Sequence, residues 1–161
     1  MSAHDRKQLL ASYASAPARL QKVLQSVPNQ VWRYKPAPAE WSIHEIVLHL
    51  ADAETNMYVR ARCAIAEPGS RVMAFGQDRW AETLRYEAQD ARLALELIRV
   101  IRELTSALLE GLPESVWANT IEHSEYGVMT LEQWLERAVK HANDHIQQIE
   151  GNLARWRQQA R

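Results

Sequence analysis

A long amphipathic helix is predicted by residues 42–64, whose sequence is SIHEIVLHLADAETNMYVRARCA. Ser42 and Glu45 have the spacing of a capping box, in which the serine side chain caps the first turn and the glutamate reaches back to the serine backbone. The sequence EPG at residues 67–69 ends the helix, because proline cannot continue it and glycine tolerates a left-handed turn. Apolar residues recur at helical spacing, at Ile43, Ile46, Val47, Leu50, Ala53, Met57, Ala61 and Ala64.

Three further helices are predicted, one before this helix and two after it. The first spans about residues 3–26. Pro17 is expected to kink this helix or split it in two, because proline lacks the N–H and its ring clashes with the preceding turn. Another helix spans about residues 80–110 and stops before Gly111. The last spans about residues 130–158 and begins with a second capping box, TLEQ.

The connections between these helices are predicted to lack strands. They cover residues 28–41, 70–79 and 117–129. Residues 70–79 are predicted to form a loop or a short helical turn. No connection has an alternating pattern that is convincing as a strand. Four helices in a chain of 161 residues predict an all-α four-helix bundle that forms a single domain over residues 1–161.

The composition excludes several classes of protein. Lysine plus arginine number 19 and aspartate plus glutamate number 20, so the formal net charge is −1. A nucleic-acid-binding protein would need excess basic charge to offset phosphates. The single cysteine, Cys63, allows no intramolecular disulfide, which fits a reducing cytoplasm. The chain contains no run of about 18 apolar residues, so no membrane span is predicted. We therefore expect a cytoplasmic protein whose partner is a small molecule rather than a nucleic acid or a membrane.

Three of the six histidines lie on the apolar faces of predicted helices. His49 belongs to the apolar stripe of residues 42–64, and His141 and His145 share the stripe of the last helix. Residues four apart on a helix lie one above the other, with Cβ atoms about 5–6 Å apart. Two such imidazoles can converge on one ion, and a histidine from a neighbouring helix can complete the set. The other three are expected to have ordinary roles: His4, His44 and His123.

A single inward histidine is more often a satisfied core residue than a metal ligand. Burying three imidazoles without partners costs on the order of 1–3 kcal/mol each, whereas one divalent ion would satisfy all three. Three histidine ligands leave open coordination positions, which is typical of catalytic sites. Water in an open position would have its pKa lowered toward about 7. The ligand types are compatible with Zn, Ni or Fe(II).

Groups that could orient these imidazoles lie close by in the sequence. Asp52 follows His49 by three residues, Asp144 precedes His145, and Gln148 follows His145 by three residues. Each is a weak candidate for a hydrogen bond to a ring nitrogen, since metal-binding histidines usually donate their other N–H to such a group. For both aspartates, a solvated place on the helix surface is the more common role.

Two segments resemble the signatures of the DinB-like (DNA-damage-inducible) superfamily. The first is PAPAEWSIHEIVLHLADAE at residues 36–54, and the second is HANDHIQQI at residues 141–149. The sequence GVMTL at residues 127–131 resembles the usual start of the last helix of these proteins. The resemblance covers essentially the whole chain, including the order and lengths of the helices.

The resemblance implies a four-helix bundle of up-down-down-up topology, often as a homodimer. It also implies a divalent metal on a histidine triad, which corresponds here to His49, His141 and His145. Better understood relatives are transferases and isomerases that use a low-molecular-weight thiol, such as bacillithiol, mycothiol or glutathione. Others were proposed to be metal-dependent hydrolases. The family name does not imply DNA binding.

Three functions are therefore considered. The first is a metal-dependent enzyme that transfers a low-molecular-weight thiol to a small electrophile, with the metal lowering the pKa of the thiol. The second is a hydrolase that uses metal-bound hydroxide at the same ligands. The third is a non-catalytic, stress-associated metal-binding dimer. A substrate carboxylate would need a cation, and Arg60, Arg62 and Arg71 lie near the end of the 42–64 helix, although a solvated role is more common there.

Overall fold

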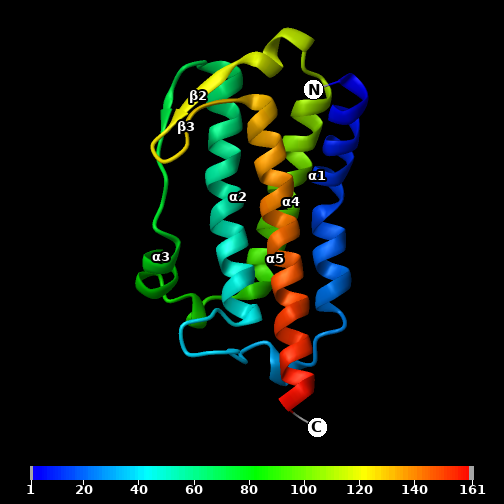
Figure 1. Ribbon diagram of the computed structural model, residues 1–161, viewed down its shortest axis with the longest axis vertical. Coiled ribbons are helices and arrows are strands. Elements are labelled where there is room, and N and C mark those ends of the chain that lie inside the picture. Colours follow the sequence, from blue (N-terminus) through cyan, green and yellow to red (C-terminus); the bar gives the residue numbers. More distant parts are fainter. Residues whose placement is uncertain (1, 160–161) are drawn as a thin grey trace.

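Four long helices form the bundle, in agreement with the predicted fold class. The computed structural model describes residues 2–159 (Figure 1). The helices of the bundle are α1 (Ala3–Leu24), α2 (Ile43–Ala66), α4 (Ala91–Glu110) and α5 (Leu131–Gln159). Helices α1 and α5 run in one direction and α2 and α4 in the other, which is the up-down-down-up order (Figure 1). Each helix packs against two neighbours: α2 on α4 and α5, and α1 on α4 and α5.

Local sequence sets the starts of the helices as predicted. The Ser42 side chain accepts a hydrogen bond from the Glu45 backbone, and the Glu45 carboxylate accepts one from the Ser42 backbone. At α5, Thr130 and Gln133 exchange the same pair of bonds. Pro17 does not split α1, which runs through it as one helix of 22 residues.

The predicted helix over residues 80–110 is wrong in its first third. It is divided into the short helix α3 (Gln77–Thr83), the 3₁₀ turn η2 (Tyr86–Ala88) and α4. Arg85 has a φ of 54°, in the left-handed region that cannot continue a helix. Asp90 then starts a new helix, because its side chain accepts a hydrogen bond from the Arg92 backbone.

The prediction of no strands is also wrong. A small sheet has the order β1 (Arg71–Val72), β2 (Thr120–His123) and β3 (Gly127–Thr130). β1 is parallel to β2, and β2 and β3 form an antiparallel hairpin in which His123 faces Gly127. Two or four residues are too few for an alternating pattern to stand out in the sequence. Two further 3₁₀ turns are η1 (Asn29–Val31) and η3 (Glu114–Ala118).

One buried arginine connects all four helices of the bundle. Arg102 of α4 and Glu54 of α2 are each 1% exposed and form an ion pair. The guanidinium also donates to the backbone oxygens of Tyr13 in α1 and Ala138 in α5. Apolar side chains fill the rest of the core. Over residues 2–159, no helix is long and apolar enough to cross a membrane.

Candidate metal centre

The three inward histidines meet between α2 and α5. His49 is 1% exposed, and His141 and His145 are half-buried. The His141 Nε2 atom lies 3.2 Å from the Nε2 atom of His49 and 3.2 Å from that of His145. One nitrogen from each ring lies within 4.8 Å of the other two. The structure thus brings together the three residues predicted from sequence.

These nitrogens are spaced as ligands of one metal ion would be. Metal–nitrogen bonds of about 2.1 Å place two ligand nitrogens about 3.4 Å apart at a tetrahedral angle and about 3.0 Å apart at a right angle. The two observed separations of 3.2 Å lie between these values, and the third pair of nitrogens lies within 4.8 Å. The donor set is three neutral imidazoles without a carboxylate, which suits Zn, Ni or Fe(II).

The imidazoles are held in the neutral form that metal binding requires. Burial, together with the neighbouring His145 and His141, lowers the pKa of His49 to about 3. Burial and His145 likewise lower the pKa of His141 to about 3. The pKa of His145 is also lowered by burial, against the opposing effect of its hydrogen bond to Gln148. Protons therefore do not compete for these nitrogens near neutral pH.

Of the three predicted orienting groups, Gln148 is the one that contacts a histidine of the triad. Its Oε1 atom lies 2.8 Å from His145 Nδ1 and can only accept, so the Nδ1 atom carries the proton and Nε2 keeps its lone pair. Asp52 instead accepts a 2.5 Å hydrogen bond from the Tyr86 hydroxyl. Asp144 pairs with Lys140 at the exposed surface. The Nδ1 atoms of His49 and His141 are buried and have no partner within residues 2–159.

Aromatic rings surround the triad. The ring centroid of Trp41 lies 4.7 Å from that of His49 and 6.3 Å from that of His145. Phe75 lies 6.1 Å from His49 and is itself supported by Trp80 at 4.5 Å. These rings pack against the imidazoles of His49 and His145.

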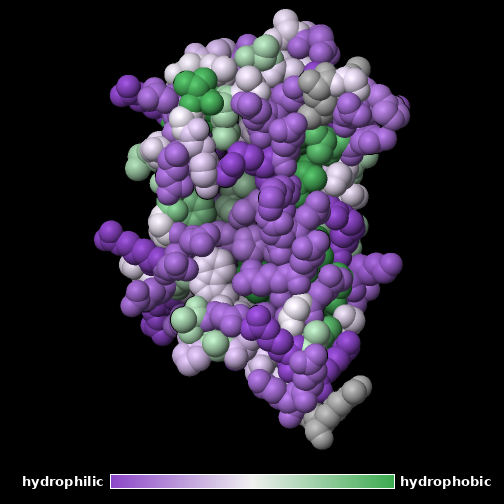
Figure 2. All heavy atoms as spheres, viewed as in Figure 1, coloured by the Kyte–Doolittle hydropathy of each residue, from purple (hydrophilic) through white to green (hydrophobic). Residues whose placement is uncertain are grey.

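Two histidines of the triad, His49 and His141, line a pocket of about 670 Å³. Its walls come from α2, from residues 74–79, from the β2–β3 hairpin and from α5. Hydrophilic side chains cover most of the face on which α5 lies, with a hollow beside it (Figure 2). Pockets of roughly 300–1,000 Å³ are typical of sites for small molecules.

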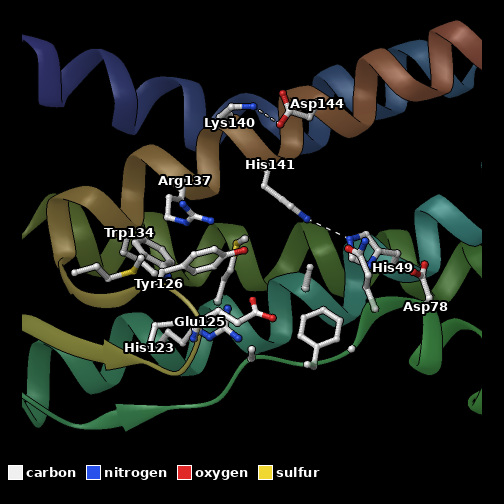
Figure 3. A pocket seen from close by; sticks show the side chains of 18 of the residues that line it. His49, Asp78, His123, Glu125, Tyr126, Trp134, Arg137, Lys140, His141 and Asp144 are labelled. Carbon is white, nitrogen blue, oxygen red and sulfur yellow. Dashed lines mark hydrogen bonds and ion pairs between the residues drawn. The ribbon is translucent and has the colours of Figure 1, made fainter.

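The far end of the pocket contains residues that sequence analysis missed. His123, Tyr126 and Arg137 lie at the end opposite His49 (Figure 3). His123 is 3% exposed rather than an ordinary loop residue. Its signal was the pattern Ile121-Glu-His123, in which alternate residues of a strand face inward. Trp134 also lines this end and presents a buried indole N–H without a partner in residues 2–159.

The three arginines near the end of α2 are placed differently from one another. Arg60 lines the pocket. Arg62 lies over the Tyr58 ring, and Arg71 pairs with Glu122 on the surface. Of the three predicted cations, Arg60 alone reaches the pocket.

Comparison with known proteins identifies the family. The profile of the DinB superfamily matches residues 12–149, which include the whole triad. The chain belongs to the DinB superfamily. The superfamily resemblance seen in the two histidine segments is therefore confirmed over most of the chain.

Individual relatives are distant but cover nearly the whole chain. A protein of Halalkalibacterium halodurans, whose name assigns it provisionally to the metal-dependent hydrolases, is 23% identical over 151 residues, which are 94% of this chain and 88% of the relative. The structure of Bacillus subtilis YfiT, described as "a probable metal-dependent hydrolase with an unusual four-helix bundle topology", superposes with a TM-score of 0.90. The two share 22% identity over 97% of this chain and 90% of YfiT.

A second solved structure shares the fold at lower similarity. A mycothiol-dependent maleylpyruvate isomerase superposes with a TM-score of 0.71 and 11% identity. The match covers 91% of this DinB-superfamily chain and 62% of the isomerase. At these identities, the likeness to both solved structures shows the fold alone.

Proposed function

We propose that this protein is a divalent-metal-dependent enzyme that transfers a low-molecular-weight thiol to a small electrophile. The observation that carries the proposal is the convergence of three neutral imidazole nitrogens within 4.8 Å of one another, with His49 and His141 lining one end of a 670 Å³ pocket. A divalent cation bound there would act as a Lewis acid that lowers the pKa of a coordinated thiol or water.

The residues of the triad provide the binding site for that cation. His49, His141 and His145 would hold it through Nε2, and Gln148 fixes the tautomer of His145 that leaves Nε2 free. Because no carboxylate belongs to the donor set, the ligands do not neutralise the charge of the ion. A cationic centre of this kind favours an anionic ligand such as a thiolate.

The pocket provides room for the two reactants of a transfer reaction. Its volume exceeds what a single small electrophile would occupy, and its walls include both apolar and charged side chains. Phe75 and Met57 supply apolar contacts. The chain itself offers no thiol there, since Cys63 is outside the pocket lining, so the sulfur would come from a cosubstrate.

Hydrolysis is the second candidate, and the descriptions of the relatives favour it. It would use the same three histidines but would require a group that accepts a proton from water. Asp78 lines the pocket and forms no ion pair within residues 2–159, so it is the candidate base of this alternative.

The first experiment measures metal content. Purified wild-type protein is expected to retain about one equivalent of divalent metal, and the variants His49→Ala and His141→Ala are expected to lose it. Removal of the metal by a chelator should lower the melting temperature of the wild type, because a ligand bound only by the native state stabilises it by about 2.7 kcal/mol at 100 times its Kd. Equal metal content in all three proteins would refute the triad as the site.

The second experiment separates transfer from hydrolysis. The metal-loaded enzyme is supplied with electrophiles such as monochlorobimane and with a panel of low-molecular-weight thiols. Conjugation that requires both thiol and metal supports transfer. Turnover of ester or amide substrates without thiol, lost in Asp78→Asn, supports hydrolysis instead. Metal binding without either reaction would support a non-catalytic role.

A further inference from the structure

We propose that the end of the pocket opposite the histidines is a binding site for a carboxylate, formed by Arg60, Arg137 and His123. This inference rests on the proposed function in one respect: it assumes that the ligand is the substrate of the metal centre. It adds the chemical class of that substrate, a small molecule with a carboxylate at one end and its reactive group at the other.

The two arginines come from different helices and face the same space. Arg60 of α2 and Arg137 of α5 both line the pocket beside Tyr126. The Arg137 guanidinium lies 3.6 Å from the centre of the Tyr126 ring, which fixes it in place and leaves its N–H edge free. Arg60 donates one bond, to the Met73 backbone oxygen.

Neither guanidinium has a carboxylate partner in residues 2–159. Burial is unfavourable for the half-buried Arg60 guanidinium and lowers its pKa. The fully buried Arg102, by contrast, has Glu54 as its partner. An anion from outside the chain would supply to Arg60 what Glu54 supplies to Arg102.

His123 adds a neutral donor to the same end. Its Nδ1 atom accepts a hydrogen bond of 3.2 Å from the Glu125 backbone, so the ring proton is on Nε2. That Nε2 atom is buried and has no partner within residues 2–159. The ring stacks on Tyr126 at a centroid distance of 4.6 Å, which holds its orientation. An unpaired N–H of this kind costs stability unless a ligand oxygen accepts from it.

The charges at this end favour a single negative charge. Glu125 also lines the pocket and opposes part of the positive charge of Arg60. Two guanidinium groups and one carboxylate leave a net charge of about +1, which a carboxylate balances and a phosphate dianion would exceed. At the other rim, Lys140 and Asp144 pair with each other and contribute no net charge.

The helices set the distance between the two ends. Arg60 lies three turns beyond His49, about 16 Å along α2, and Arg137 lies one turn before His141, about 6 Å along α5. The two spacings average about 11 Å, so a ligand roughly 10 Å long would reach from the histidine end of the pocket to the arginine end.

The test is an NMR titration of the metal-free full-length protein that follows the arginine Nε–Hε signals. Sodium hexanoate is compared with hexanamide, which has the same shape without the charge, and with inorganic phosphate. Hexanoate is expected to bind at least about ten-fold more tightly than hexanamide. Arg60→Gln and Arg137→Gln should each weaken hexanoate binding about ten-fold and leave hexanamide binding unchanged. Arg62→Gln, two residues from Arg60 but outside the pocket, is the matched control and should change neither.

The same comparison in cobalt-loaded protein uses 6-mercaptohexanoate and 6-mercaptohexanamide, whose thiol is detected by its charge-transfer absorption. The carboxylate is again expected to strengthen binding about ten-fold, through both arginines. Equal binding of hexanoate and hexanamide, or an equal loss in Arg62→Gln, would overturn the proposal. Tighter binding of phosphate would overturn the assignment to a carboxylate. Because the hexanoate titration needs no metal, its failure is distinct from failure of the metal-content test.

Discussion

Replacing Gln148 by leucine should weaken metal binding without unfolding the protein. The Gln148 Oε1 atom accepts the proton of His145 Nδ1 at 2.8 Å, and it is the one side chain in residues 2–159 that bonds to the outer nitrogen of a histidine in the triad. Without that bond, the His145 ring is free to rotate and to carry its proton on Nε2, where the metal would bind. Loss of such a hydrogen bond typically lowers metal affinity 10–100-fold, or about 1.4–2.7 kcal/mol.

The affinity is measured for zinc at constant pH by competition with a chelating dye. Gln147→Leu is the control, because it makes the same chemical change at the exposed neighbouring position. Gln148→Glu keeps an acceptor for the His145 proton and is expected to retain most of the affinity. Urea unfolding of the metal-free proteins verifies that all variants fold. If Gln148→Leu and Gln147→Leu bind zinc within two-fold of each other, the tautomer argument is wrong.

Three further predictions concern the folded chain. The pKa values of His49 and His141 are lowered from 6.5 to about 3, so the unfolded chain binds more protons between these pH values. The unfolding free energy of metal-free protein should therefore fall as the pH is lowered from 7 toward 4, with a smaller slope in His141→Gln, and equal slopes in urea titrations would contradict this. Arg102→Met should cost about 3–5 kcal/mol in urea unfolding because it leaves Glu54 buried without a partner, and Glu54→Gln in the same chain should recover part of the loss. Asp90→Ala should cost about 1 kcal/mol in the same assay if Asp90 caps α4, whereas no change would show that the cap is dispensable.

The parts of the fold that were predicted correctly depend on local chemistry. The capping boxes at Ser42 and Thr130 and the long apolar stripes are signals within a few residues of one another, so the four helices of the bundle were predicted from them. The break near residue 85 was missed because the apolar spacing continues across it. Asp90 is a good helix-capping residue, but it does not itself indicate that the preceding residues leave the helix.

The metal centre could be predicted from local sequence signals, whereas the far end of its pocket could not. His141 and His145 are neighbours on one helix, and His49 lies on the apolar stripe of another, so the triad was predictable before the family resemblance supported it. The far end combines Arg60 of α2, His123 of a four-residue strand and Arg137 of α5. Their proximity depends on a hairpin whose strands are too short to be recognised from the sequence.

The order of the helices explains why the histidines lie in a pocket rather than on an open groove. Helices α2 and α4 are parallel neighbours, so the chain must return along the bundle between them, and α2 alone is about 36 Å long. Residues 67–90 make this return beside α2 (Figure 1). On the way they form β1, which pairs with the hairpin that carries His123, and then place Phe75 6.1 Å from His49. In an up-down-up-down bundle, short loops would join antiparallel neighbours and no segment would cover this groove. The crossover required by the topology is thus the element that closes the pocket beside His49 and His141.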